Sequence, residues 1–316
     1  MAAGIGIDVG GTATKGAVVT SAGEVLLRAE RPTDPSAGTK GILALVETLL
    51  EQASAEAVEV SSVGVGAAGF IDAERGAVTF SPNLVYDDPE IVAALGSRTN
   101  LPAVVDNDAN AAAWGEYRVG AAKGVAHLAF LTIGTGLGSG FVIDGALLRG
   151  ASGAGAELGH MVVDPDGPKC PCGLRGCLEQ FVSGTAIERM AREAITSGEE
   201  TAITAFIETG AEVSGEDVAR AAREYDEVAR RILGRAGSAL GLGLSNVVNL
   251  FDPHVIVLGG SVVKAGEPYL GAARDRLADM LAAQRRRPVR LDVSTLGNTA
   301  GIVGAALLGL DALEVA

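Results

Sequence analysis

Three shortages in the sequence each exclude a class of protein. Basic residues are too few to balance the acids, and the 316-residue chain has a formal net charge of −14. A field of that sign repels phosphate backbones, so we expect no nucleic-acid partner. No apolar run reaches the roughly eighteen residues of a membrane span, and no basic segment precedes the first apolar run. We therefore expect a cytoplasmic protein without a membrane partner.

Cysteine is also scarce, and the sequence has no GxxxxGK[ST] phosphate loop. Three cysteines are an odd number, which argues against a disulfide framework and for a reducing compartment. Apolar residues (48%) and 44 glycines are abundant, as in a compact globular protein with many tight turns. The length favours two lobes over one domain.

The three cysteines lie in one short stretch together with a histidine. Cys170, Cys172 and Cys177 follow the pattern CxCx4C, and His160 lies upstream. Three sulfurs and one imidazole complete a tetrahedral zinc site, and structural zinc sites are closed at four ligands. The spacing is not the common CxxC, so three small buried thiols beside an unrelated histidine stay an alternative. Because glycines at 173 and 176 tighten the loop, we predict a structural zinc site.

Two acidic residues of the same stretch are not needed by the metal. Glu157 precedes the histidine by three residues, and Glu179 follows the last cysteine by two. Carboxylates held beside a rigid metal loop are strong acceptors at fixed angles. This arrangement suits a polyol ligand.

Strand and helix patterns alternate along the chain, which indicates an α/β fold. Short apolar runs between turn residues predict strands over 4–8, 16–20, 25–27, 61–66, 103–106, 125–132, 141–143, 146–148, 255–258 and 291–294. Helical spacing predicts helices over 39–55, 89–95, 184–197, 201–208, 214–224, 224–249, 268–284 and 299–313. Glycines inside the helices 224–249 and 299–313 indicate closely packed neighbours.

Two glycine loops about 124 residues apart share one order of chemistry. The segments 9–12 and 133–136 are each followed by an apolar strand. A dinucleotide-binding fingerprint needs a helix after GxGxG, so that interpretation is rejected. Backbone N–H groups of such loops can converge on phosphate oxygens, with Thr12, Lys15 and Thr135 as added donors. We predict a duplicated lobe with a phosphate site.

Two further positions carry candidate ligand contacts. The strand 103–106 runs into a helix that starts at Asn107 or Asp108, and a side chain there has the plain structural explanation of a helix N-cap. The buried strand 255–258 ends in Gly259 and Gly260, where ligands bind in open α/β sheets.

Several of these segments together resemble the ROK (repressor, open reading frame, kinase) family. The resemblance rests on residues 8–15, 107–108, 135–138, 155–160 and 170–179, and it runs from Gly4 to about Gly309. It implies a two-lobed, actin-like sugar-kinase fold, with ribonuclease-H-like duplicated lobes around a cleft and a structural zinc loop. The small N-terminal lobe would comprise 1–107 plus 297–316, and the large lobe, with the zinc loop, 108–296.

The resemblance also implies a role for each site residue. Asp108 would be the catalytic base. The sugar would be bound by Gly69, Asn83, Asn107, Asp108, Glu157, His160 and Glu179. ATP would be bound by Gly10, Gly11, Thr12, Lys15, Gly134, Thr135, Gly136, Gly138, Gly259 and Gly260, with Asp8 facing Mg²⁺. Zinc would be held by His160, Cys170, Cys172 and Cys177. One position departs from the family, since Tyr86 stands where many members have tryptophan.

The expected activity is the transfer of phosphate from Mg-ATP to the 6-hydroxyl of glucose. Another hexose (N-acetylmannosamine, fructose or mannose) or polyphosphate as donor remains an alternative. A sugar-sensing repressor is more distant, since it needs a helix-turn-helix before the first glycine loop, which only residues 1–3 precede. We expect a homodimer or homotetramer.

Overall fold

The computed structural model describes residues 2–81, 84–208 and 210–315. The chain forms two compact units, and each is described by itself. Unit 1 comprises Met1–Phe130, Gly140–Ala156 and Ser294–Ala316, and unit 2 comprises Leu131–Ser139 and Glu157–Val293. The catalytic lobes that the sequence predicts, with boundaries at 107/108 and 296/297, stay a prediction.

A five-stranded sheet forms the centre of unit 1. Its order is β3-β2-β1-β4-β7, with β1 (Ala3–Val9), β2 (Ala13–Thr20), β3 (Val25–Pro32), β4 (Val60–Ala67) and β7 (Ala103–Asn107). The first three strands are antiparallel neighbours, whereas β1, β4 and β7 run parallel. The carboxyl ends of the parallel strands therefore meet at one edge, with Asp8, Gly66 and Asp106 in register.

A second five-stranded sheet repeats this topology. Its order is β10-β9-β8-β11-β12, with β8 (Leu128–Ile133), β9 (Leu137–Ile143), β10 (Ala146–Leu147), β11 (Val255–Gly259) and β12 (Arg290–Val293). In both sheets the order, by position along the chain, is third, second, first, fourth and fifth. The glycine loops 9–12 and 133–136 each join the first two strands, which confirms the predicted duplication.

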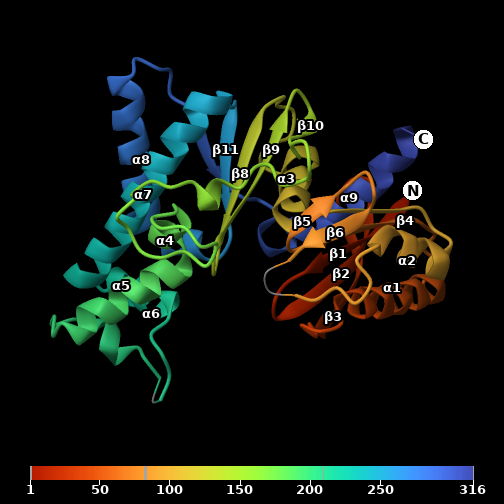
Figure 1. Cartoon of the computed structure of the whole chain (residues 1–316), viewed down its shortest axis with the longest axis horizontal. Coiled ribbons are helices and arrows are strands. Elements are labelled where there is room, and N and C mark those ends of the chain that lie inside the picture. Colours follow the sequence, from red (N-terminus) through yellow and green to blue (C-terminus); the bar gives the residue numbers. More distant parts are fainter. Residues whose placement is uncertain (1, 82–83, 209, 316) are drawn as a thin grey trace. The chain divides into compact units, whose positions relative to one another are not determined.

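The two faces of β1 are built for different partners. Ile5 and Ile7 are fully buried in the core that includes helix α1 (Gly38–Ala55). The alternating Gly4 and Gly6 face the final helix α9 (Ala300–Val315); a Cβ on Gly6 would lie 2.0 Å from the Ile302 carbonyl oxygen. Because these glycines have no side chains, α9 can lie directly on the sheet. Figure 1 shows α9 beside the strands of unit 1.

The remaining elements of unit 1 extend these layers. Helix α2 (Ile91–Thr99) packs beside α1, and α3 (Asp108–Arg118) packs along α9, while β5 (Phe70–Asp72) and β6 (Ala77–Phe80) form a small hairpin. A Cβ on Gly304 would lie 1.7 Å from the Ala111 carbonyl oxygen. The prediction that the final helix packs closely is therefore confirmed.

Unit 2 is mostly helical outside its strands. Helix α7 (Glu227–Phe251) packs against α8 (Glu267–Ala283), and a Cβ on Gly237 would lie 2.1 Å from the Tyr269 carbonyl oxygen. The predicted close neighbour of the long helix is thus α8. The other helices are α4 (Glu179–Val182), α5 (Gly184–Thr196) and α6 (Gly215–Arg223), with 3-10 turns at Leu158–His160 and Val262–Ala265.

The prediction of a helix over 201–208 is wrong. The segment forms only a 3-10 turn, Ala202–Ala205. Its first amide donates to the Asp226 carboxylate at 2.7 Å, and the same carboxylate caps α7 by accepting from the Ala229 amide at 2.7 Å. Because Asp226 is the N-cap of α7, this helix begins at Glu227 rather than 224. Across the described residues, the helices are too short or too polar to cross a membrane.

Candidate active site and metal centre

Two carboxylates occupy the edge of the unit 1 sheet where the parallel strands end. Asp8 lies on β1 opposite Lys15 of β2, and Asp108 is the first residue of α3, directly after β7. Burial, followed by the charge of Asp108, raises the pKa of Asp8 to about 7, against the opposing effect of Lys15. Burial also raises the pKa of Asp108, although its bonds to the Ala109 amide and Asn107 act in the other direction. Two partly buried acids that repel each other favour a bound proton or cation.

The structure shows which of Asn107 and Asp108 caps helix α3. The Asn107 Oδ1 accepts from the amides of Ala109 (2.9 Å) and Asn110 (3.2 Å), so Asn107 is the N-cap of α3. Its Nδ2 donates to the Gly69 carbonyl at 3.1 Å. Asp108 therefore does not serve as the cap, and its carboxylate is available for chemistry.

The loop between β1 and β2 is held by a residue that the sequence did not single out. Thr33, just after β3, donates from its hydroxyl to the Gly10 carbonyl (2.7 Å) and from its amide to the Thr12 carbonyl (3.0 Å). A further hydroxyl contact joins it to Thr14 at 2.9 Å. The only sequence signal for this role is a threonine at the end of a strand. Sequence spacing does not show that Thr33, which follows β3, contacts the loop between β1 and β2.

The glycines of this loop serve close approach rather than a left-handed turn. Neither Gly10 nor Gly11 has a positive φ. A Cβ on Gly11 would meet no described atom within 4 Å, and one on Gly10 would lie 2.9 Å from the Ala13 carbonyl oxygen. A positive φ is therefore not the reason for glycine at position 11, and the space beside Gly11 is open to a ligand.

The second glycine loop lies at the ends of β8 and β11 in unit 2. The Gly134 amide donates to the Gly136 carbonyl at 3.0 Å, and the Thr185 hydroxyl donates to the Thr135 carbonyl at 2.8 Å. Gly260, with φ +89°, lies directly against β8: a Cβ there would be 2.2 Å from the Ile133 carbonyl oxygen. The unit 2 residues predicted to bind ATP, including Gly138 on β9 and Gly259 at the end of β11, thus belong to three consecutive strands, β9, β8 and β11, and to the loops at their ends.

The predicted sugar ligands of unit 2 are anchored to the start of β9. A Glu179 Oε2 atom accepts from the Leu137 amide at 2.9 Å. The Leu158 amide, beside Glu157, donates to the Ser139 hydroxyl at 3.2 Å. The 3-10 turn that follows carries His160, and its amide donates to the Glu157 carbonyl at 3.1 Å. One strand end therefore brings Glu157, His160 and Glu179 into one region of unit 2.

The three cysteines and His160 form a single cluster. One ligand atom from each residue lies within 4.8 Å of all the others. The Cys170 sulfur is 3.6 Å from His160 Nδ1, and the Cys172 and Cys177 sulfurs are 3.6 Å apart. Tetrahedral zinc with bonds of about 2.3 Å to sulfur separates its sulfur ligands by roughly 3.8 Å. The donor set and its spacing fit zinc, with His160 Nδ1 on the metal side.

Backbone turns bring the cysteines together. Gly173 (φ +97°) and Gly176 (φ +68°) adopt left-handed conformations, as expected of a tight loop. A Cβ on Gly176 would lie 1.5 Å from the Asp164 carbonyl oxygen. Burial and the neighbouring thiols raise the pKa of Cys177 to about 12. Burial also raises the pKa of Cys170, whereas the hydrogen bond from the Leu174 amide lowers the pKa of Cys172. Thiolates this close together need a nearby cation, which supports a metal as the partner of the cluster.

Comparison with known proteins agrees with this arrangement. The model of the ROK family matches residues 4–312. The chain belongs to the ROK family. It is 36% identical to the glucokinase of Thermotoga maritima over 96% of this chain and 95% of that protein. It is 37% identical to the glucokinase of Streptomyces coelicolor, covering 96% of each. Among solved structures, the ROK family glucokinase from Streptomyces griseus in complex with glucose and AMPPNP is 38% identical, with a TM-score of 0.84 and coverage of 98% and 99%.

Tyr86, where the sequence was expected to depart from the family, lies close to Asp108 of unit 1. The Tyr86 hydroxyl donates to the Ala68 carbonyl at 3.4 Å, and its ring packs on Gly38. Burial, followed by the charge of Asp108, raises the pKa of Tyr86 well above its usual value. Tyr86 therefore belongs to the region of Gly69 and Asp108. Asn83, also predicted to contact the sugar, lies outside the described residues.

Proposed function

We propose that this ROK chain is an ATP-dependent glucokinase. It transfers the γ-phosphoryl group of Mg-ATP to the 6-hydroxyl of glucose and releases glucose 6-phosphate and ADP. Glucokinases similar over nearly their whole length support the choice of glucose and ATP. The observation that carries the mechanism is the division of labour at α3, where Asn107 is the N-cap and the helix does not need the Asp108 carboxylate as its cap.

Asp108 takes the proton of the sugar 6-hydroxyl as that oxygen attacks the γ-phosphorus. A carboxylate whose pKa is raised by burial is a better proton acceptor than one in water. Transition states of phosphoryl transfer are loose, so correct positioning of the hydroxyl contributes as much as basicity. The Asn107 cap fixes the start of α3 and thereby the direction from which Asp108 reaches its substrate.

The two glycine loops bind the triphosphate. Backbone amides around Gly10–Thr12 and Gly134–Gly138 donate to its oxygens, Lys15 adds a positive charge, and Gly259 and Gly260 contact the adenosine. Asp8 would hold the magnesium ion, because its carboxylate lies beside a second acid and a bound cation relieves that repulsion. When bound, Mg²⁺ neutralises charge on the phosphate oxygens.

The sugar hydroxyls are bound by the acceptors of unit 2. Glu157 and Glu179 accept hydrogen bonds from them, and His160 offers the ring nitrogen that does not face the cysteines. With Nδ1 on zinc, the proton must reside on Nε2, so the metal fixes the tautomer of His160. Four protein ligands leave no open position, so zinc takes no part in phosphoryl transfer.

We further infer a cytoplasmic homodimer or homotetramer that catalyses the first step of glycolysis. The resemblance to the family supports this assignment, and metal-bound thiols suit a reducing compartment. Light scattering on the purified protein measures the mass in solution and distinguishes these states from a monomer.

A coupled ADP-release assay over a panel of hexoses tests the proposed function. Glucose with ATP is expected to give a kcat/KM at least about ten-fold above those of N-acetylmannosamine, fructose and mannose, since a site that hydrogen-bonds each hydroxyl discriminates against sugars whose hydroxyls are replaced or differently placed. A parallel glucose 6-phosphate assay with polyphosphate identifies the donor. Turnover of another hexose in preference to glucose, or of polyphosphate in preference to ATP, would contradict the proposal.

A further inference from the structure

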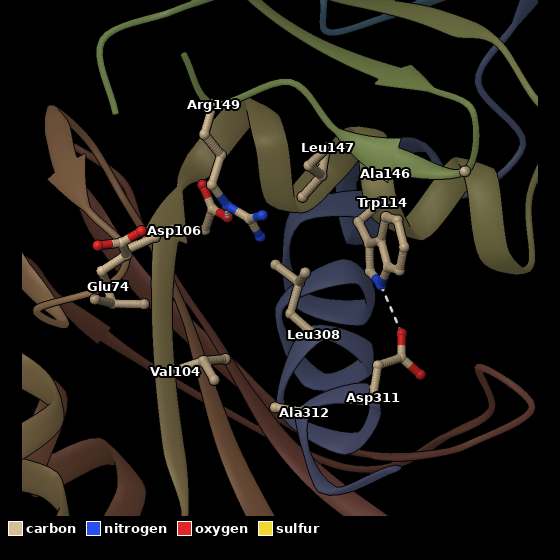
Figure 2. A pocket seen from close by; sticks show the side chains of 13 residues that line it. Glu74, Val104, Asp106, Trp114, Ala146, Leu147, Arg149, Leu308, Asp311 and Ala312 are labelled. Atoms are coloured by element: carbon tan, nitrogen blue, oxygen red, sulfur yellow. Dashed lines mark hydrogen bonds and ion pairs between the residues drawn. The ribbon is translucent and has the colours of Figure 1, made fainter. Parts of the chain in front are cut away.

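A cavity in unit 1 is not used by the proposed reaction. Its volume is about 730 Å³, within the range of roughly 300–1,000 Å³ of small-molecule sites. The lining comes from β7, α3, α9, the segment around β10 and the turn between β5 and β6, and all of it belongs to unit 1. Figure 2 shows these side chains around the space.

Most of the wall is apolar. Leu147 and Leu308 extend into the cavity from the β10 segment and from α9, and the Trp114 ring of α3 covers one side. Apolar atoms next to solvent in a concave surface favour a ligand with an apolar body, because its burial releases water from both surfaces.

The acids of the cavity already have partners. Asp106, which is 3% exposed, accepts from the Asn107 amide (2.8 Å), Asn110 Nδ2 (2.9 Å) and Arg149 Nε (2.7 Å). Asp311 accepts from the Trp114 Nε1 group at 2.7 Å and forms an ion pair with Arg118. These carboxylates therefore do not require a ligand.

Arg149 differs from these acids in its hydrogen bonding. Only its Nε atom is bonded to Asp106, and within the described residues no hydrogen bond involves its two Nη groups. Figure 2 shows the guanidinium between Asp106 and the Leu308 side chain, and the Arg149 side chain is 39% exposed. A guanidinium with free Nη donors binds a carboxylate in a directed, charge-assisted way.

We propose that this cavity binds a small monocarboxylate with an aromatic or branched apolar body. The carboxylate pairs with the Nη groups of Arg149, and the apolar body lies against Trp114, Leu147 and Leu308. A phosphate dianion is a poorer match, since Asp106 and the rim residue Glu74 add negative charge on the same wall. This site goes beyond the kinase reaction and does not depend on it.

Trp114 provides the measurement, because it is the one tryptophan of the 316-residue sequence. The emission of the full-length protein is titrated with 4-phenylbutyrate and, separately, with the uncharged 4-phenylbutan-1-ol, which shares its apolar body. We expect a saturable change in emission with the carboxylate and binding on the order of ten-fold weaker with the alcohol, since only the acid forms the charge-assisted bonds.

Three variants locate the probe. Arg149→Gln is expected to weaken the carboxylate on the order of ten-fold, and Ala312→Phe, which fills the cavity from a partly exposed position of α9, should abolish the change. Arg98→Gln removes an exposed arginine on α2 and should leave binding unchanged. The proposal is contradicted if the carboxylate gives no saturable signal or binds no better than the alcohol. It is also contradicted if Arg149→Gln and Ala312→Phe bind the carboxylate as tightly as the native protein does.

Discussion

Asn107 and Asp108 are neighbours with different tasks, and their sequence alone does not separate them. Both residue types favour the N-cap position, so the start of α3 could be predicted but not which side chain caps it. The answer depends on backbone geometry: Asn107 has the extended conformation of an N-cap and reaches two amides, whereas Asp108 is already helical. The catalytic assignment of Asp108 rested on resemblance, and the capping geometry now gives it a physical basis.

Asp8 is expected to destabilise the free protein at alkaline pH. Its pKa is about 7 in the folded state and 3.8 for a solvent-exposed carboxyl, so between these values the folded state binds more protons than the unfolded state. The free energy of unfolding therefore falls as pH rises from about 4 to about 7. Asp8→Asn cannot ionise and should regain this energy at pH 8, while its kinase activity falls.

Thermal unfolding without added magnesium measures the effect of Asp8→Asn. Each kcal/mol regained raises the midpoint by about 2–4 °C in a protein of this size. The gain of the variant over the native protein should be larger at pH 8 than at pH 5.5, where the native carboxyl binds a proton. If the difference in midpoint between the variant and the native protein is equal at both pH values, or if the variant is less stable at pH 8, the pKa of Asp8 is not raised in the folded state.

At the scale of elements, the loop between β1 and β2 depends on Thr33. Thr33→Val keeps the shape but removes the hydroxyl bond to the Gly10 carbonyl, which is worth about 0.5–1.5 kcal/mol. We expect the KM for ATP to rise several-fold and the KM for glucose to change little. Thr48→Val, which removes a comparable hydroxyl bond on the exposed face of α1, is the control. An increase in the glucose KM alone would place the loop at the sugar instead.

The metal loop is the second element that the function requires. Cys172→Ser should lose stoichiometric zinc and raise the glucose KM roughly 10- to 100-fold, as when supporting groups of metal sites are disturbed. The KM for ATP should change less, because the loop around Glu157, His160 and Glu179 carries the predicted sugar contacts. Metal analysis and a glucose titration measure the two effects.

Leu174→Ser is the matched control for the zinc loop. It changes a side chain that is 53% exposed in the same turn without removing a ligand, so it should keep both zinc and the native glucose KM. A zinc-free Cys172→Ser protein that binds glucose normally would separate the metal from sugar recognition.

Element by element, the limits of prediction are physical. The metal cluster could be predicted, since four uncommon ligands lie within one short segment. Thr33 could not, because its partners Gly10 and Thr12 belong to a different strand pair and only the sheet order β3-β2-β1 brings them together. The segment 201–208 failed because a long-range bond from Ala202 to Asp226 outweighs local helical spacing.

On the scale of the whole molecule, two sheets of the same order carry the two glycine loops at equivalent strand junctions. The repeated loops made this duplication predictable. The parallel pairing of β4 and β7, and the return of α9 to the first sheet, depend on contacts between distant segments. Nothing in the sequence marks Gly6 and Gly64 as packing positions. Because they have no side chains, α9 can pack directly on the sheet.

The seating of α9 on the first sheet can be tested with one methyl group. A Cβ on Gly64 would lie 1.7 Å from the Ala305 carbonyl oxygen, so Gly64→Ala must displace the helix and should destabilise the protein by about 1–3 kcal/mol or more. Gly96→Ala, on α2 where no described atom lies within 4 Å, should be neutral or stabilise by about 0.4–1 kcal/mol. Thermal unfolding compares the two, and equal effects would contradict the packing account.

The turnover of Asp108→Asn tests the central claim most directly. The amide preserves the shape of the side chain, and Asn107 still caps α3, so folding should be intact while the proton acceptor is lost. ADP release with saturating glucose and ATP should fall by a factor on the order of 10² to 10⁴, whereas Asp275→Asn, an exposed acid on α8, should retain native turnover. Native turnover in a correctly folded Asp108→Asn protein would contradict the assignment of Asp108 as the base.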